Sequence, residues 1–110
     1  MDKETLLQKA SSASFKKTNG LVLRTINILR ERYNKLDVVQ DVLEDSGTDI
    51  SSFIDSVNFL SMEGYIQLRK IDGHEIADIA DTSYKDLEAK VTGKGVRLLA
   101  GNIIDGMIEV

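Results

Sequence analysis

The chain has 110 residues, of which 42% are hydrophobic and 29% charged, and its net charge is −4; this size and balance fit one globular domain with its own core. It contains no cysteine, which excludes disulfides, a thiol nucleophile and thiolate metal ligands. Its apolar runs are too short to cross a bilayer and its N-terminal stretch lacks the apolar segment of a secretory signal, so we expect a cytoplasmic protein without membrane contact.

The charges are unevenly distributed along the chain. Residues 1–35 carry eight bases against three acids, a net +5, whereas residues 36–92 carry four bases against thirteen acids, a net −9. Only the N-terminal third is therefore suited to a polyanion such as nucleic acid. The acids of the middle segment also have a simpler interpretation, as a solvated surface.

The first third of the chain predicts an extension followed by an amphipathic helix. Residues 1–17 are either helical or disordered, because Leu6 and Leu7 precede the weak helix former SSAS. Thr18 or Asn19 is expected to cap the amphipathic helix by accepting hydrogen bonds from free backbone amides. Apolar residues then recur at helical spacing, namely Val22, Ile26, Leu29 and Tyr33, widened by Leu21 and Ile28.

Two further helices are predicted in the middle of the chain. Asp37 is expected to cap a short helix that ends at Gly47, with its apolar residues facing inward; these are Val38, Val39, Val42 and Leu43. Thr48 or Asp49 caps the next helix, which ends at Gly64. Its inward face is predicted to consist of Ile50, Phe53, Ile54, Val57 and Leu60.

The last third predicts a β-hairpin and a closing helix. YIQLRKI alternates with period two and DLEAKV alternates again, so both segments are predicted strands. Asp72-Gly73 is a tight-turn dipeptide, and residues 74–85 form either a second strand with a loop or a long wing tip. Thr92 is expected to cap the closing helix, with Val96, Leu99 and Ala100 turned inward.

This order of elements resembles the winged helix, a relative of the helix-turn-helix. VVQDVLEDSGTDISSFIDSVNFLSMEGYI resembles the helix-turn-helix of MarR- and PadR-type bacterial regulators, and KVTGKGVRLL is similar to their entry into the helix after the wing. The resemblance also extends to small winged-helix proteins of bacteria and phages. It implies an α+β fold, with a three-helix core, a β-hairpin wing and a C-terminal helix over residues 18–101, an extension at 1–17 and an apolar tail at 102–110.

The resemblance further implies which residues would contact double-stranded DNA. The outward face of the third helix would comprise Ser51, Ser52, Asp55, Ser56, Asn58 and Met62. The expected DNA-binding residues are Ser51, Ser52 and Asn58, with Arg69 and Lys70 of the wing and Lys16, Lys17 and Arg24 of the N-terminal third. The chain departs from the family pattern, since residues 36–68 hold seven acids and no base, although phosphate neutralisation dominates DNA affinity. Arg69 therefore either contacts a phosphate or pairs with a nearby carboxylate.

No pattern in the sequence predicts catalysis, a metal or a cofactor. His74 is the only histidine and falls at a predicted turn, where a solvated side chain is the common outcome. TGKG at 92–95 lacks the upstream glycine and the final Ser or Thr of a phosphate-binding loop. We therefore expect a protein that is not an enzyme.

Two functional hypotheses follow. The first is a homodimeric DNA-binding transcriptional regulator, because twofold symmetry is the usual device for binding two half-sites. The second is a winged-helix module that binds another protein through its acidic surface or its apolar tail. That tail either completes the core or forms a dimer or partner contact through Ile103, Ile104, Met107 and Ile108.

Overall fold

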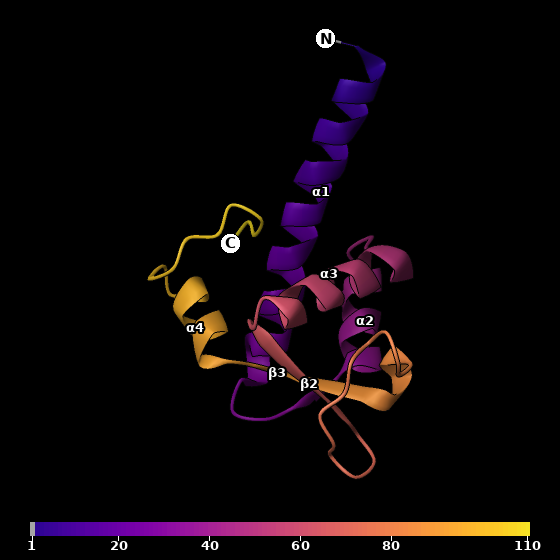
Figure 1. Cartoon of the computed structure of the whole chain (residues 1–110), viewed down its shortest axis with the longest axis vertical. Coiled ribbons are helices and arrows are strands. Elements are labelled where there is room, and N and C mark those ends of the chain that lie inside the picture. The colour runs from indigo at the N-terminus through magenta and orange to yellow at the C-terminus, as the bar shows by residue number, and fades with distance from the viewer. Residues whose placement is uncertain (1) are drawn as a thin grey trace.

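The computed structural model describes residues 2–110, and the side chains of all of these except residues 10–12. Within this range the chain is an α+β fold with four α-helices and a three-stranded antiparallel sheet (Figure 1). Its elements in chain order are α1 (Lys3–Ile26), the 3-10 turn η1 (Asn27–Leu29), β1 (Asn34–Lys35), α2 (Leu36–Glu44), α3 (Ile50–Met62), β2 (Ile66–Lys70), the 3-10 turn η2 (Tyr84–Asp86), β3 (Leu87–Val91) and α4 (Gly93–Leu99).

The first helix is longer than predicted. Helix α1 begins at Lys3, where the Asp2 carboxylate accepts a hydrogen bond of 2.8 Å from the Thr5 amide. The predicted start at Thr18 or Asn19 is wrong: both residues lie inside the helix and are buried. Asp2 is as good a capping residue as they are, and it lies between four and five turns earlier, at about 3.6 residues per turn.

The two central helices follow the sequence expectations in part. Asp49 caps α3 as predicted, accepting a hydrogen bond of 2.7 Å from the Ser52 amide. Gly47 and Gly64 have positive φ angles of 90° and 78°, which confirms that they end the helices before them. Helix α2 instead begins at Leu36 without a side-chain cap, so the predicted cap at Asp37 is wrong; this residue lies in the first turn.

The sheet has the strand order β1-β3-β2. Strands β2 and β3 pair antiparallel, with Leu68 opposite Ala89 and Arg69 opposite Glu88, as the two alternating segments predicted. The turn is shifted by one residue from Asp72-Gly73, since Gly73 and His74 have the positive φ angles. Within residues 74–85, an isolated bridge between Ile76 and Arg69 is followed by a loop that leads into η2.

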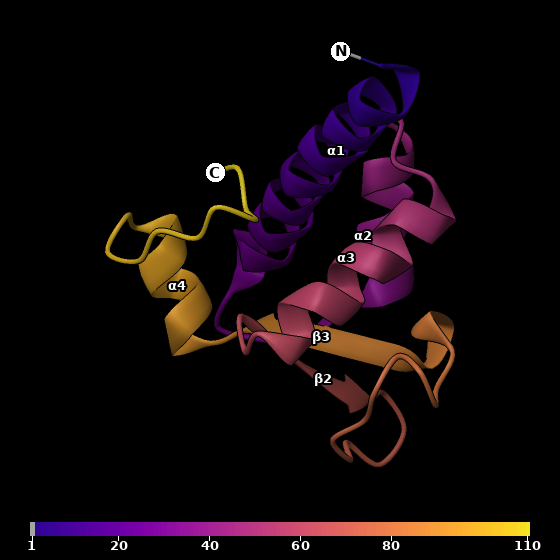
Figure 2. The same ribbon diagram turned by 45° about the horizontal axis from the view of Figure 1, so that its top comes forward.

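The core lies between the helices and the inner face of the sheet (Figure 2). Its fully buried side chains come from α1, α2, α3, β3 and α4 and include Leu23, Leu43, Phe53, Leu87 and Leu98. Thr92 caps α4 as predicted. The inward face of α4 is centred on Leu98, whereas Val96 and Leu99 are half-buried and Ala100 is exposed, so the expectation for Ala100 is wrong. No helix in the described part of the chain is long and apolar enough to cross a membrane.

Candidate functional site

The polar side chains on the outer face of α3 are either uncharged or acidic. Ser51 and Asp55 are exposed, Ser52 and Asn58 are half-buried, and Met62 is exposed. Asn58 is partly engaged already, because its amide Nδ2 lies 3.4 Å from the Met62 sulfur. The helix contains no lysine or arginine, so its surface offers Ser and Asn donors without a phosphate-neutralising charge.

Two residues of α3 do not lie where the sequence predicted. Ser56, expected on the outward face, is completely buried because it shares the inner face with Phe53, Val57 and Leu60. Ile50, expected to face inward, is exposed. The buried face of α3 is thus rotated slightly about the helix axis from the predicted apolar face. Helix α1 covers part of this buried face through an edge-to-face contact between Phe15 and Phe59, whose ring centroids lie 5.4 Å apart.

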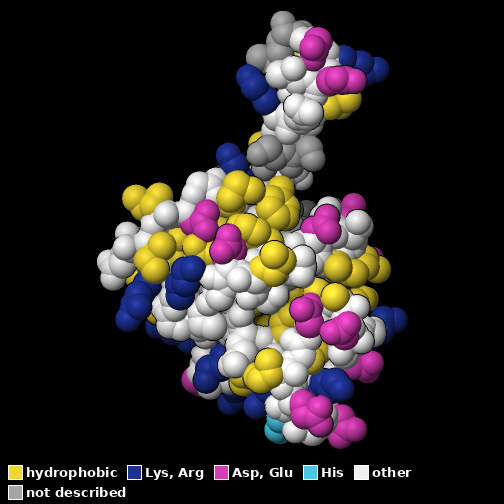
Figure 3. All heavy atoms as spheres, viewed as in Figure 1, with side chains coloured by type: hydrophobic (Ala, Val, Ile, Leu, Met, Phe, Trp, Pro, Cys, Tyr) yellow, Lys and Arg dark blue, Asp and Glu magenta, His cyan; other side chains and the backbone are white. Residues whose placement is uncertain are grey.

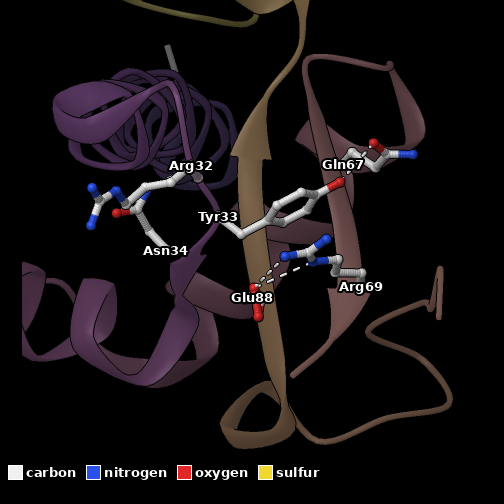
Figure 4. A network of polar contacts seen from close by, with 6 residues as sticks. All are labelled: Arg32, Tyr33, Asn34, Gln67, Arg69 and Glu88. Atoms are coloured by element: carbon white, nitrogen blue, oxygen red, sulfur yellow. Dashed lines mark hydrogen bonds and ion pairs between the residues drawn. The ribbon is translucent and has the colours of Figure 1, made fainter. Parts of the chain in front are cut away.

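Arg69 is held on the outer face of the sheet by two neighbours (Figure 4). Its Nη2 and Nε atoms lie 3.2 Å and 3.3 Å from Glu88 Oε2. Its guanidinium carbon lies 3.6 Å from the centroid of the Tyr33 ring, whose hydroxyl donates a hydrogen bond of 2.9 Å to Gln67. Of the two alternatives for Arg69, the structure shows the carboxylate pair, which neutralises its charge within the fold.

The remaining predicted DNA contacts do not meet on one surface. Lys70 lies on β2, with its Nζ 3.9 Å from Glu75. Lys16, Lys17 and Arg24 lie along α1. One shallow depression does bring Lys17 beside Ser52 at the start of α3, together with Asp49, but Arg69 and Lys70 are on a different element and do not line it.

The C-terminal tail packs on its own chain. Ile108 is buried and Ile103 packs against the core, so both complete the monomer, whereas Ile104 is 94% exposed and Met107 is exposed. The tail crosses α1 and is held there by two hydrogen bonds. The Asn19 side-chain amide donates one of 2.9 Å to the Met107 carbonyl, and the Glu109 backbone amide donates one of 3.0 Å to the Lys16 carbonyl. Of the four predicted dimer contacts, the fold leaves Ile104 and Met107 available.

A polar pair fixes the start of this tail. The Tyr65 hydroxyl donates a hydrogen bond of 2.6 Å to Asp105 Oδ2. Burial, followed by this bond and the neighbouring carboxylates, raises the pKa of Tyr65 to about 12. The same hydroxyl, with the Met107 amide, lowers the pKa of the Asp105 carboxyl. Each partner thus favours the protonation state that keeps the pair together at neutral pH.

An apolar groove lies between the end of α1, η1 and α2, and the sequence did not predict it. It encloses about 290 Å³. Ile28 is 74% exposed and Val38 56% exposed, and Leu29 and Val42 are also exposed, so the expectation that Val38 and Val42 face inward is wrong. Helix α2 is apolar at five of its nine positions, which is more apolar side chains than its buried face can accommodate. The lining residues are Thr25, Ile28, Leu29, Tyr33, Asn34, Lys35, Val38, Val39 and Val42.

Other depressions are lined mainly by polar and charged side chains. One of about 680 Å³ lies beside the end of β2 and the loop after it and is lined by Lys70 and by several acids, among them Asp72, Glu75, Asp81 and Asp86. Among the described residues, no group of three or more His, Asp or Glu side chains could hold a metal ion. His74 is exposed on the turn. The groove, which is lined by four large exposed apolar side chains, is therefore the strongest candidate for a functional site.

Comparison of the chain with protein-family models, with curated proteins and with solved structures found no match.

Proposed function

We propose that this chain is a non-enzymatic winged-helix protein that binds another protein through the apolar groove between η1 and α2. The winged-helix proposal rests on the order of elements: three helices with a short strand after the first, then two antiparallel strands and a closing helix. A fold of this kind hosts many functions. The function therefore rests on the surface rather than on the fold.

The observation that carries the proposal is the exposure of four large apolar side chains in one place. Ile28, Leu29, Val38 and Val42 all line the groove or its rim and remain in water in the single chain. A contiguous exposed apolar surface is unfavourable in water and commonly marks a protein contact site. An aromatic side chain, Tyr33, and a polar rim of Thr25, Asn34 and Lys35 complete an arrangement typical of protein interfaces.

A second candidate function is DNA binding, favoured by the outer face of the sheet. The strand register places Lys35 opposite Glu88 and Gln67 opposite Lys90, so two lysines flank the pair of Arg69 and Glu88. Arg30 and Arg32 precede β1 in the chain. This basic region would supply phosphate contacts that α3 lacks, as a DNA-binding regulator requires.

Fluorescence anisotropy with a mixed-sequence DNA duplex, titrated with salt, tests the two candidates. The protein-module proposal predicts no measurable DNA binding, even at low salt. DNA affinity that falls steeply with salt, and that weakens in Lys35→Ala/Lys90→Ala, would instead support a regulator.

A second measurement tests the groove directly with the fluorescent apolar probe anilinonaphthalene sulfonate. The wild-type chain at low concentration is expected to bind the probe, and Val38→Glu/Val42→Glu is expected to lose it without a change in far-UV circular dichroism. Ile104→Glu serves as the control, because that side chain is exposed away from the groove. Equal probe binding by all three proteins would contradict the proposal.

A further inference from the structure

The N-terminal half of α1 projects from the body of the molecule. It stands clear of the body in the ribbon and in the space-filling view (Figures 1 and 3). Of its described side chains before Phe15, none is buried, and Leu6 and Leu7 are 54% and 60% exposed. A helical segment of roughly 12 residues without tertiary contacts is only marginally stable in water. Its two exposed leucines are available for a contact with another chain.

The same chain thus carries a projecting helix with two exposed leucines and an apolar groove. We infer that the groove of one copy receives the N-terminal half of α1 from a second copy, in an antiparallel dimer with twofold symmetry. This inference rests on the proposed function, because it assigns a partner to the groove. Each copy supplies one helix and one groove, so the contact forms twice in an isologous interface.

The spacing along α1 and η1 allows both contacts to form at once. Leu6, Lys17 and Ile28 are separated by eleven residues each, close to three helical turns, so the three positions share one face. Leu6 and Ile28 are therefore about 33 Å apart along the helix at about 1.5 Å per residue. A twofold axis beside Lys17 places each Leu6 against the Ile28 of the other copy, at the mouth of its groove.

The charges of the two surfaces are complementary in this register. On the shared face, positions whose numbers add up to 34 lie opposite each other. Lys9 faces the position of Thr25, which lines the groove together with Val42; the neighbour of Val42 is Asp41. Helix α2 and the residue after it carry four acids and no base, whereas residues 3–14, the half of α1 that enters the groove, carry two lysines and one acid. A segment with a net positive charge thus meets the acidic helix.

One residue opposes the arrangement and makes it testable. Lys17 is exposed and lies at the twofold axis, so it faces Lys17 of the second copy. Like charges at this distance weaken association, although long lysine side chains can diverge in water. Replacing Lys17 with leucine removes the repulsion and adds apolar contact. The register therefore predicts a variant that associates more tightly than the wild-type chain.

Sedimentation velocity of the full chain over a range of concentrations tests the inference. We expect the wild type to dimerise, Leu6→Glu to weaken dimerisation by on the order of tenfold or more, and Lys17→Leu to strengthen it by a similar factor. Ile104→Glu is the matched control and should leave dimerisation unchanged. The tighter association of Lys17→Leu cannot result from misfolding.

The results that overturn the inference are separable from those that overturn the proposed function. A chain that stays monomeric at all concentrations, or a dimer lost in Ile104→Glu and kept in Leu6→Glu, overturns the second copy as the occupant. If such a chain still binds anilinonaphthalene sulfonate in a manner abolished by Val38→Glu/Val42→Glu, the groove remains a docking surface for a different protein. Without that probe binding, both proposals fail.

Discussion

At the scale of single residues, Gly20 determines how closely the tail crosses α1. A Cβ atom at this position would overlap the carbonyl of Glu109, and the backbone of that residue is held by the Lys16 carbonyl. Glycine is costly inside a helix by about 1 kcal/mol relative to alanine. Its presence here is explained by the close approach of two backbones.

Gly20→Ala should accordingly destabilise the chain by about 1–2 kcal/mol, since an overlap of about 1–3 kcal/mol exceeds the gain in helix propensity. In a chain that ends at residue 106 the same substitution should stabilise, because the overlapping carbonyl is gone. Urea unfolding of the full-length and the shortened chain, each with and without Gly20→Ala, measures this change of sign. Gly93→Ala is the control, as nothing lies within 4 Å of its added Cβ. The same sign in both backgrounds would show that the tail does not cross at Gly20.

The hydrogen bond between Tyr65 and Asp105 predicts a pH dependence at both ends of the scale. The pKa of Asp105 is lowered in the folded chain, so its contribution is present above the ordinary value and is lost as pH falls through the lowered value. The pKa of Tyr65 is raised from 10.0 to about 12, so its contribution is complete below pH 10 and is lost as pH rises towards 12. The pair therefore stabilises the tail over the whole neutral range.

We expect Tyr65→Phe to lower the free energy of unfolding by about 1 kcal/mol at pH 7. The difference from wild type should shrink below a pH of about 4 and again above about 10. Urea midpoints across this range provide the measurement. Asp49, whose pKa is also lowered by its capping bond to the Ser52 amide, is present in both proteins and cancels. A difference that does not change with pH would mean that the pair does not form.

At the scale of elements, the outer face of the sheet is stabilised by Arg69, Glu88 and Tyr33. The Glu88 side chain is only 11% exposed, so removal of its partner leaves a largely buried carboxylate unpaired. This arrangement makes Arg69 a structural residue. Its charge is engaged within the fold before any ligand arrives.

Arg69→Met should therefore destabilise the fold by about 1–3 kcal/mol, with most of the loss recovered in Arg69→Met/Glu88→Gln, because the double variant removes the unpaired charge. A double-mutant cycle by urea unfolding measures the coupling. Lys35→Met/Glu88→Gln is the comparison cycle for the lysine opposite Glu88 in the register. Additive effects in the Arg69 cycle would contradict the ion pair.

The sequence predicted those elements whose ends are defined by local chemistry. Helices begin after the capping residues Asp49 and Thr92 and end before Gly47 and Gly64, which have positive φ. Both effects depend on neighbouring residues alone. It failed where two solutions satisfy the same pattern. Asp2 and Thr18 are both adequate caps, and only the complete fold decides between them.

The candidate site could be predicted only in part for the same reason. Val38 and Val42 lie beside Val39 and Leu43 in α2, and helical spacing alone does not decide which apolar face is buried. Arg69 pairs with a residue nineteen positions away, which depends on strand register. The tail docks partly through the backbone groups of Met107 and Glu109, and these two contacts leave no signal in the tail's own side chains.

At the scale of the whole molecule, a globular body carries a projecting helix on one end (Figures 1 and 2). The apolar groove lies near the other end of the same helix. The body itself is complete, since its core includes residues from α1 to Ile108 of the tail. Leu6 and Leu7 of the projecting helix and the four large apolar side chains of the groove remain exposed in the monomer. The central claim is that a second copy of this chain covers them.

Methyl-resolved NMR during dilution tests this claim most directly. We predict that the methyl signals of Leu6, Ile28, Val38 and Val42 shift together as the protein is diluted, because a single dissociation event exposes all of them. The Ile104 methyl signals should not move, since this side chain is already 94% exposed. Signals of the helix and of the groove that stay fixed over the whole dilution range, or a shift confined to Ile104 and Met107, would contradict the claim.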